Sequence, residues 1–197
     1  MNLIQKWCVV ILREFILYSR RGRTDSKFTS LYEAGRLDLV HECIEASLFL
    51  SHRIRRNVVF HALLGGPPSP PLHLKVDGAT LRNVRTDQET WKQILKNSLS
   101  GRPHTGITTD KTSFETLLKT KANEAPIYVL EESGKDIFES DIDDNPVFVL
   151  GDHIGLPRKA EGFALRYGQK ISLGKQLYLA ASCIGIVNYL LDRRAIV

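Results

Sequence analysis

Three short apolar segments in the last third of the chain constrain the fold more than any other feature. Residues 127–130 and 147–150 are rich in apolar side chains, residues 170–173 contribute Ile171 and Leu173, and each segment is followed by a polar turn that contains glycine. Continuous apolar runs of this length are typical of strands buried on both faces, as in a parallel sheet. The turns are Glu131-Glu132-Ser133-Gly134, Gly151-Asp152-His153-Ile154-Gly155-Leu156-Pro157 and Gly174-Lys175-Gln176. The pattern predicts an α/β fold with a ligand site where the carboxyl ends of these strands meet.

The rest of the chain supplies further strands and helices. Strands are predicted over residues 8–18, with Arg13 and Glu14 as an interruption, and over residues 58–64. Residues 72–76 alternate and turn at Asp77-Gly78, which predicts a hairpin into residues 80–84. Helices are predicted over residues 37–50, from Asp87 to residue 99, from the capping sequence Thr112-Ser113-Phe114-Glu115 onward, and over residues 176–191. The last helix is apolar almost all round, which indicates burial against a second subunit.

Length and composition favour one globular domain. The 197 residues are 43% hydrophobic and 25% charged, and no apolar stretch near a terminus is long enough to cross a membrane. Cys8, Cys43 and Cys183 lie in unrelated contexts, so neither a disulfide framework nor a zinc site is indicated, and we expect a cytoplasmic protein. The net charge of +5 and the clustered arginines favour an anionic partner.

Individual residues near the predicted site have two interpretations. His153 could act as a base, but a histidine after a strand is at least as often a structural hydrogen-bonding group. Cys183 is better interpreted as a packing residue that lines a pocket than as a nucleophile. His41-Glu42 lacks the second histidine of a zinc-protease helix, and the turns match neither a dinucleotide nor a nucleoside-triphosphate motif. The sequence therefore predicts no metal site.

Several separated motifs, in the same order, resemble the archaeal TrmY family of tRNA pseudouridine-54 N1-methyltransferases, which belongs to the SPOUT superfamily. The first motifs are Gly35-Arg36-Leu37-Asp38-Leu39, Ser51-His52-Arg53-Ile54-Arg55 and Gly65-Gly66-Pro67-Pro68-Ser69-Pro70-Pro71. The later ones are Phe148-Val149-Leu150-Gly151-Asp152-His153-Ile154-Gly155-Leu156-Pro157, Ile171-Ser172-Leu173-Gly174-Lys175 and a final helix with Cys183-Ile184. The resemblance covers roughly residues 13–193.

The resemblance implies a SPOUT-type parallel-sheet fold with a C-terminal trefoil knot, which is a rare exception to unknotted topology, in a homodimer. It implies methyl transfer from S-adenosylmethionine to N1 of pseudouridine 54 in the T-loop of tRNA. Two alternatives remain open: an enzyme of the same fold that acts on a ribosomal RNA pseudouridine, and an RNA-binding assembly factor without catalysis.

Residue roles follow from the matched motifs and from the chemistry of the reaction. The expected cofactor-binding residues are Leu130, Gly151, Asp152, His153, Gly174, Lys175, Gln176, Leu177, Tyr178 and Cys183. The proton on N1 must be removed as the methyl group arrives, and a carboxylate or a water that it positions could serve as the base. Asp38 and Asp77 are the candidates, with Asp38 preferred because it lies in a matched motif. Arg36, Arg53 and Arg55 are expected to contact RNA.

The amino-terminal segment departs from the family pattern. The family usually begins with methionine directly before a sequence like Arg13-Glu14-Phe15-Ile16-Leu17, whereas residues 1–12 precede it here. Residues 1–12 are therefore interpreted as an extension from an upstream start, and residues 13–197 as a single methyltransferase domain. The intact mass of the native protein would test this interpretation.

Overall fold

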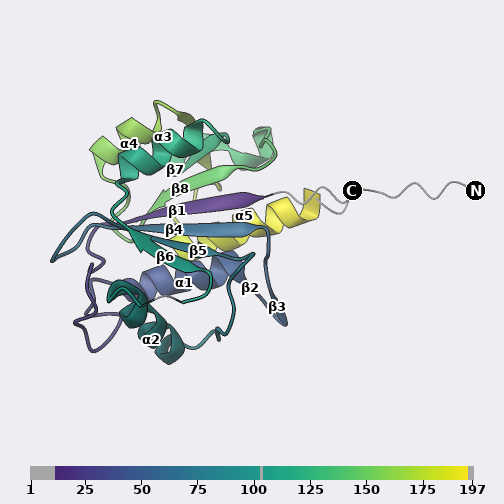
Figure 1. The fold of residues 1–197 in the computed structure, drawn as a ribbon. Coiled ribbons are helices and arrows are strands. Elements are labelled where there is room, and N and C mark those ends of the chain that lie inside the picture. The colour runs from purple at the N-terminus through teal and green to yellow at the C-terminus, as the bar shows by residue number, and fades with distance from the viewer. Residues whose placement is uncertain (1–11, 103, 195–197) are drawn as a thin grey trace, which may run out of the picture.

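The computed structural model describes residues 12–102 and 104–194, and in them seven strands form one sheet in the order β6-β5-β4-β1-β8-β7-β9 (Figure 1). The strands are β1 (Arg13–Ser19), β4 (Val58–Leu64), β5 (Leu72–Asp77), β6 (Ile107–Asp110), β7 (Ile127–Asp136), β8 (Val147–Gly151) and β9 (Gly168–Ser172). All neighbours from β4 to β9 pair in parallel, and β5 and β6 are antiparallel to their neighbours. The α/β fold with a mostly parallel sheet is confirmed.

Helices cover both faces of the sheet. On one face lie α1 (Leu37–Leu48), α2 (Gln88–Leu99) and α5 (Ala180–Arg194), and on the other lie α3 (Phe114–Ala122) and α4 (Arg158–Ala164) (Figure 1). In β1, Phe15 and Leu17 belong to the core under α1 and α5, whereas Ile16 belongs to the core under α3 and α4. Apolar side chains on both faces therefore keep β1 at the centre of the sheet.

Short elements complete the chain. A two-stranded hairpin pairs β2 (Phe49–Leu50) with β3 (Arg53–Ile54), and a single 3-10 turn, η1 (Ile137–Glu139), follows β7. None of the helices in the described part of the chain has the length and apolar character needed to cross a membrane.

Most element boundaries agree with the predictions, with shifts at their ends. Asp87 accepts a hydrogen bond from the backbone of Thr90 and caps α2 as expected, whereas Ser113 caps α3 in place of Thr112. The helix predicted over residues 37–50 ends at Leu48, because the strand β2 begins at Phe49. The helix predicted from residue 176 begins at Ala180. Part of the first predicted strand, residues 8–11, lies outside the described residues.

The hairpin predicted between residues 72–76 and 80–84 is wrong. The strand β5 instead pairs with β4 on one side and with β6 on the other. Beyond Asp77 the chain folds into a tight turn, in which the Asp77 carbonyl accepts hydrogen bonds from the backbone of Thr80 and Leu81. The Arg56 guanidinium donates hydrogen bonds to the carbonyls of Gly78 and Leu81. These two backbone carbonyls therefore have a side-chain donor in place of a partner strand. The strand β6 was not predicted because only Ile107 among its residues is buried.

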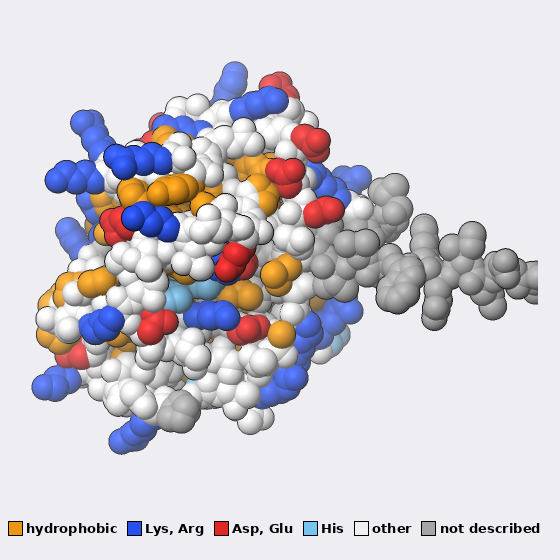
Figure 2. All heavy atoms as spheres, turned by 45° about the horizontal axis from the view of Figure 1, so that its top comes forward, with side chains coloured by type: hydrophobic (Ala, Val, Ile, Leu, Met, Phe, Trp, Pro, Cys, Tyr) orange, Lys and Arg blue, Asp and Glu red, His pale blue; other side chains and the backbone are white. Residues whose placement is uncertain are grey.

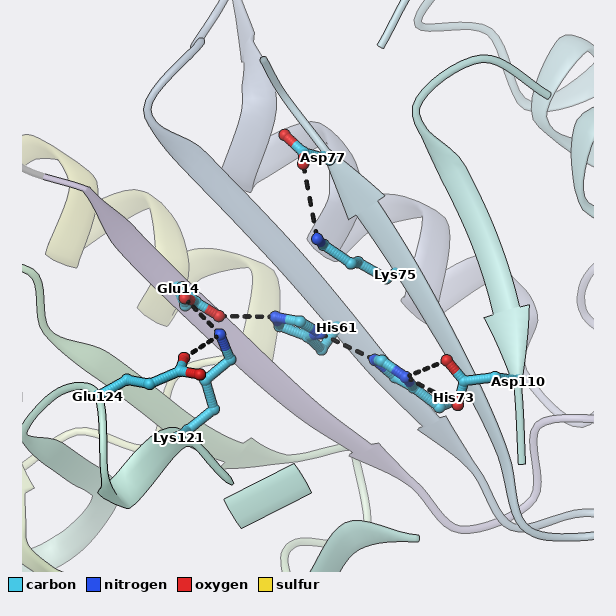
Figure 3. Close-up of polar contacts among 8 residues, drawn as sticks. All are labelled: Glu14, His61, His73, Lys75, Asp77, Asp110, Lys121 and Glu124. Atoms are coloured by element: carbon cyan, nitrogen blue, oxygen red, sulfur yellow. Dashed lines mark hydrogen bonds and ion pairs between the residues drawn. The ribbon is translucent and has the colours of Figure 1, made fainter. Parts of the chain in front are cut away.

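Arg13 and Glu14 do not interrupt β1, because both buried charges have partners. Glu14 contacts Nζ of Lys121 on α3 at 2.9 Å and Nε2 of His61 on β4 at 2.7 Å (Figure 3). The chain of contacts continues from Nδ1 of His61 to Nε2 of His73 at 2.8 Å, and from Nδ1 of His73 to Asp110 at 3.2 Å. This polar chain links four strands and one helix beside the apolar core.

The ionisation of this polar chain depends on burial. Burial is the largest cause that lowers the pKa of His61 and of His73, while Glu14 and Asp110 oppose the shift. Burial raises the pKa of Glu14, but hydrogen bonds from His61 and Lys121 outweigh it, and the pKa of Glu14 is lowered. Because the folded histidines bind protons less readily than unfolded ones, their contribution to stability is present above about pH 6.5 and is lost as the pH falls.

We expect the free energy of unfolding to fall as the pH is lowered from 7.5 to 5.5, with each histidine contributing at most about 1.4 kcal/mol per pH unit. His73→Gln should reduce this slope because it removes one of the three buried histidines in the described part of the chain, which are His41, His61 and His73. Denaturant unfolding at a series of pH values measures the slope. His52→Gln is the matched control, since His52 is exposed. Equal slopes in wild type and His73→Gln would contradict the prediction.

Candidate functional site

A cavity of about 450 Å³ lies where the carboxyl ends of β7, β8 and β9 meet. Its walls include Leu130 at the end of the regular part of β7, Gly151 at the end of β8 and Ser172 at the end of β9. The chain then passes from β9 through residues 176–179 into α5, and these residues close another side of the cavity. The three glycine-containing segments singled out in the sequence therefore come together, as expected for strands that are neighbours in a parallel sheet. The first of them, Glu131-Glu132-Ser133-Gly134, is not the predicted turn, because β7 continues through it to Asp136 with an irregularity between Leu130 and Lys135.

Nine of the ten residues expected to bind the cofactor line this cavity. They are Leu130, Gly151, Asp152, His153, Gly174, Gln176, Leu177, Tyr178 and Cys183. The exception, Lys175, is an exposed residue. Sequence reasoning missed the remaining lining residues, which are Glu131, Glu132, Leu150, Ile154, Gly155, Ile171, Ser172, Leu173, Leu179 and Ala180. All of them lie within or next to the segments that follow the predicted strands. The positions of these strands would therefore have been enough to predict them as lining residues.

Two glycines shape the cavity walls for different reasons. A Cβ atom on Gly151 would lie 2.3 Å from the backbone of Gly155 and of Leu156, so no side chain fits there. Gly174 has a φ of +109°, a conformation that residues with a side chain rarely adopt, but a Cβ atom there would meet nothing within 4 Å. Space excludes a side chain at Gly151, and backbone conformation disfavours one at Gly174.

Asp152 anchors the loop that follows β8. Its carboxylate accepts hydrogen bonds from the backbone N–H groups of Arg20 at 2.8 Å and Ile154 at 2.9 Å, and its side chain is 4% exposed. Its own backbone N–H donates to the carbonyl of Tyr18 at 3.2 Å. Because the carboxylate is already bonded within the protein, Asp152 holds the turn in place for a ligand. His153, with its side chain 30% exposed, is the freer group.

The cavity wall has acidic and neutral groups. Burial is the largest cause that raises the pKa of Glu131, with Glu161 and Glu132 adding to it and Lys170 opposing it. A partly buried carboxylate of this kind favours a cationic group nearby. Burial also raises the pKa of Cys183, and its thiol lies 3.7 Å from the carbonyl of Tyr178. A neutral thiol agrees with the interpretation of Cys183 as a lining residue.

The two candidate bases lie at opposite ends of the parallel strands. Asp38 is in the first turn of α1, next to Leu39, which borders a small gap shared with Asp152 and His153. The Asp38 carboxylate accepts hydrogen bonds from the Arg36 guanidinium at 3.0 to 3.1 Å and does not line the cavity itself. Asp77 ends β5 opposite Val59 near the amino end of β4, so the structure places it away from the cavity.

The three arginines expected to contact RNA do not all lie together in the folded chain. Arg36 is at the amino end of α1, on the cavity side of the molecule, whereas Arg53 and Arg55 precede β4 at the other edge of the sheet. Arg53 is exposed. Arg55 is 12% exposed and contacts the Asp192 carboxylate at 2.7 Å, beside the Arg13–Asp192 pair. These contacts lower the pKa of Asp192 against the raising effect of its burial.

Thiols and carboxylates do not form a metal centre in the described part of the chain. No group of three or more potential metal ligands occurs there, and Cys43 and Cys183 are free thiols. Cys8 lies outside the described residues.

Comparison with known proteins gives consistent results. The model of a family described as "Putative SAM-dependent RNA methyltransferase" matches residues 12–196. A protein of Methanocella arvoryzae named tRNA (pseudouridine(54)-N(1))-methyltransferase is 37% identical, with 93% of this chain and 100% of that protein covered. A Pyrococcus abyssi protein of the same name is 35% identical, with 94% and 100% covered.

A solved structure has the same fold. The crystal structure of Archaeoglobus fulgidus Nep1 bound to S-adenosylhomocysteine superposes with a TM-score of 0.64 at 13% identity, covering 93% of this chain and 98% of that one. At this identity the likeness concerns the fold alone.

We expect Gly151→Ala to lower the free energy of unfolding by about 1–3 kcal/mol, because the new methyl group would overlap the backbone of Gly155 and Leu156. Gly162→Ala is the matched control. Gly162 lies in α4 with nothing within 4 Å of its Cβ position, so alanine there should stabilise the helix by up to about 1 kcal/mol. Denaturant unfolding measures both, and equal effects of the two variants would contradict the steric argument.

Arg55→Ala should cost about 1.5 kcal/mol of stability because it leaves a half-buried Asp192 with fewer hydrogen bonds. Arg53→Ala, two residues away and exposed, should change stability by less than about 0.5 kcal/mol. Thermal and denaturant unfolding of the pair of variants tests this difference. An Arg55→Ala protein as stable as Arg53→Ala would show that the contact with Asp192 contributes nothing.

Proposed function

This chain belongs to the family of SAM-dependent RNA methyltransferases, and we propose that it transfers a methyl group from S-adenosylmethionine to N1 of pseudouridine 54 in the T-loop of tRNA. The observation that carries the proposal is the near full-length similarity to proteins that bear this name, at 31% to 37% identity. The cavity at the ends of β7, β8 and β9 supplies the site. S-adenosylmethionine is the cofactor, and tRNA is the partner.

The cavity fits the proposed cofactor. Its volume of about 450 Å³ is within the range of small-molecule sites. The carboxylates of Glu131 and Glu132 on its wall complement a cationic ligand. Backbone groups of residues 130, 151–153 and 174–178, with Cys183, would hold the cofactor. When bound, S-adenosylmethionine supplies an electrophilic methyl group on its sulfonium.

The residues of the chain must then position the base and accept the proton from N1. Asp38 is the proposed base, because its neighbour Leu39 borders a small gap together with Asp152 and His153, and both of these line the cavity. Arg36 holds the Asp38 carboxylate and is placed to contact the RNA backbone with its remaining N–H groups. The target nucleotide must leave its stacked position to reach this site, as in other base-modifying enzymes.

A homodimer accounts for two features that a single chain leaves open. Leu177 is 81% exposed, Leu179 is 63% exposed and Tyr189 is 58% exposed, and all three lie on or just before α5. A second copy would cover these apolar side chains. It would also supply a second set of arginines, which the proposed RNA-binding roles of Arg36, Arg53 and Arg55 call for, because Arg53 and Arg55 lie at the opposite end of the strands from the cavity of their own chain.

The remaining proposals concern the organisation of the chain. We propose that its carboxyl-terminal part forms the trefoil knot of the SPOUT fold, that residues 13–197 are one domain, that residues 1–12 are an extension to it, and that the protein acts in the cytoplasm. Residues 1–11 lie outside the described part of the chain, whereas Leu12 donates its backbone N–H to Asn145 at 2.8 Å.

The test is methyl transfer from labelled S-adenosylmethionine to tRNA transcripts that carry either uridine or pseudouridine at position 54, followed by nucleoside mass spectrometry. We expect N1-methylpseudouridine only from the second transcript. Asp38→Asn should lower kcat at least 10-fold with little change in cofactor affinity, because general-base catalysis contributes about 10²–10⁴-fold.

Three other outcomes would overturn parts of the proposal. Equal methylation of both transcripts would refute the requirement for pseudouridine. Methylation of ribosomal RNA alone would move the function to a ribosomal target. Saturable cofactor binding without methyl transfer to any RNA would indicate an assembly factor.

A further inference from the structure

A second cavity, of about 380 Å³, lies at the same edge of the sheet as the first but on the face that carries α3. Its walls come from three parts of the chain: the ends of β1 and β4, the proline-rich loop after β4, and the start of α3. The lining residues are Tyr18, Leu63, Leu64, Gly65, Pro70, Pro71, Ser113, Phe114 and Glu115. None of them belongs to the first cavity.

The walls of this second cavity are mostly apolar. The rings of Tyr18 and Phe114 meet edge to face with their centroids 5.1 Å apart, and exposed Pro70 and Pro71 form the facing wall. Polar groups are few. They are the Tyr18 hydroxyl, the exposed Glu115 carboxylate and the Ser113 hydroxyl, which accepts a hydrogen bond from the backbone of Thr116. Burial first, and then the charges of Glu115 and Asp152, raise the pKa of Tyr18, so its hydroxyl remains a donor.

One strand end connects the two cavities. Tyr18 pairs with Gly151 across β1 and β8, and the next residues place Arg20 between the two cavities. The Arg20 backbone N–H donates to Asp152 of the first cavity at 2.8 Å. Its carbonyl oxygen is 3.0 Å from where a Cβ atom on Gly65 of the second cavity would lie. A ligand that reached both cavities would therefore pass over Arg20.

The surroundings of the second cavity are cationic. Arg20 and Arg21 are exposed directly after Ser19, and Lys111 is exposed on the other side, with its Nζ atom 2.9 Å from the Ser69 hydroxyl in the proline-rich loop. On the face of the molecule that carries α3 and α4, hydrophobic side chains are exposed between lysines and arginines (Figure 2). Apolar walls with cations at the rim complement a flat, neutral group attached to an anionic backbone.

We propose that the second cavity binds an unpaired nucleobase of the RNA substrate, one that neighbours the nucleotide in the first cavity. The base stacks on Tyr18 and against Pro70 and Pro71, Glu115 accepts a hydrogen bond from an exocyclic amine or imide N–H, and Arg20 and Lys111 neutralise the adjacent phosphates. The inference rests on the proposed function, because it takes RNA as the substrate. An apolar peptide would fill the same walls but would gain nothing from the cations.

The test uses a T-arm hairpin with pseudouridine at the target position and a set of hairpins that each carry one abasic nucleotide in the loop. Affinity is measured by fluorescence anisotropy, without S-adenosylmethionine, so that binding is separated from methyl transfer. We expect one abasic position beside the target to weaken binding to wild type about 10-fold, within the range for one stacked base. Tyr18→Ala should weaken binding of the intact hairpin by a similar factor and should add nothing at that abasic position.

Matched variants distinguish the loss of base stacking or of positive charge from a loss of binding that is caused by misfolding. Tyr18→Phe keeps the ring and should bind within about 3-fold of wild type, whereas Tyr167→Ala, which removes a tyrosine that is 38% exposed after α4, should bind normally. Lys111→Glu should weaken binding and reduce its salt dependence, and Lys119→Glu, an exposed site further along α3, should do neither. If Tyr18→Ala does not fold, 2-aminopurine at the sensitive position supplies the readout, because its fluorescence should be quenched on binding to wild type.

The outcomes distinguish this inference from the proposed function. Wild type that methylates the hairpin, but shows no sensitive abasic position and no effect of Tyr18→Ala or Lys111→Glu, would overturn the nucleobase site and leave the proposed function intact. Wild type that binds the hairpin with the predicted pattern, but transfers no methyl group, would overturn the proposed function and leave the nucleobase site. Wild type that does not bind the hairpin would overturn both.

Discussion

The contact between Asp152 and the end of β1 holds the functional edge of the molecule together. The strands β1 and β8 are parallel, and the loops that leave them would diverge without a link. The Asp152 carboxylate supplies this link through the backbone of Arg20, while the Asp152 backbone bonds to Tyr18. A carboxylate that accepts two backbone hydrogen bonds is difficult to replace, because an apolar substitute would remove both charge-assisted bonds. The first cavity depends on this contact, and the second cavity shares the same strand end.

Sequence reasoning predicted the parallel part of the sheet and the first cavity, because both depend on local signals. Continuous apolar runs mark strands buried on two faces, and glycine marks turns where two backbone segments lie close together, as at Gly151. The hairpin beyond Asp77 could not be predicted correctly, since the choice of partner for β5 depends on β6, a strand with one buried residue. The second cavity was not predicted either. It is made by Tyr18, Pro70 and Phe114, which are far apart in sequence and carry no shared motif.

Charge is used in two ways in this protein. Buried charges such as Glu14 and Arg13 have partners on other elements and tie strands to helices, so they stabilise the fold without contributing to the site. Exposed charges such as Arg20, Arg53 and Lys111 have few constraints and are available to an anionic partner. Arg55 shows why sequence position alone does not separate the two groups. It lies two residues from Arg53, yet it is bonded to Asp192 on α5.

The central claim is that residues 131–134 of β7 and the turns after β8 and β9 bind S-adenosylmethionine as one site. Amide hydrogen exchange, followed by mass spectrometry with and without the cofactor, tests this claim directly. The account predicts slower exchange in residues 131–134, 151–156 and 174–180, and unchanged exchange in residues 65–71 of the proline-rich loop. Slower exchange in residues 65–71 and 113–115, with no slowing in residues 131–134, 151–156 and 174–180, would contradict it.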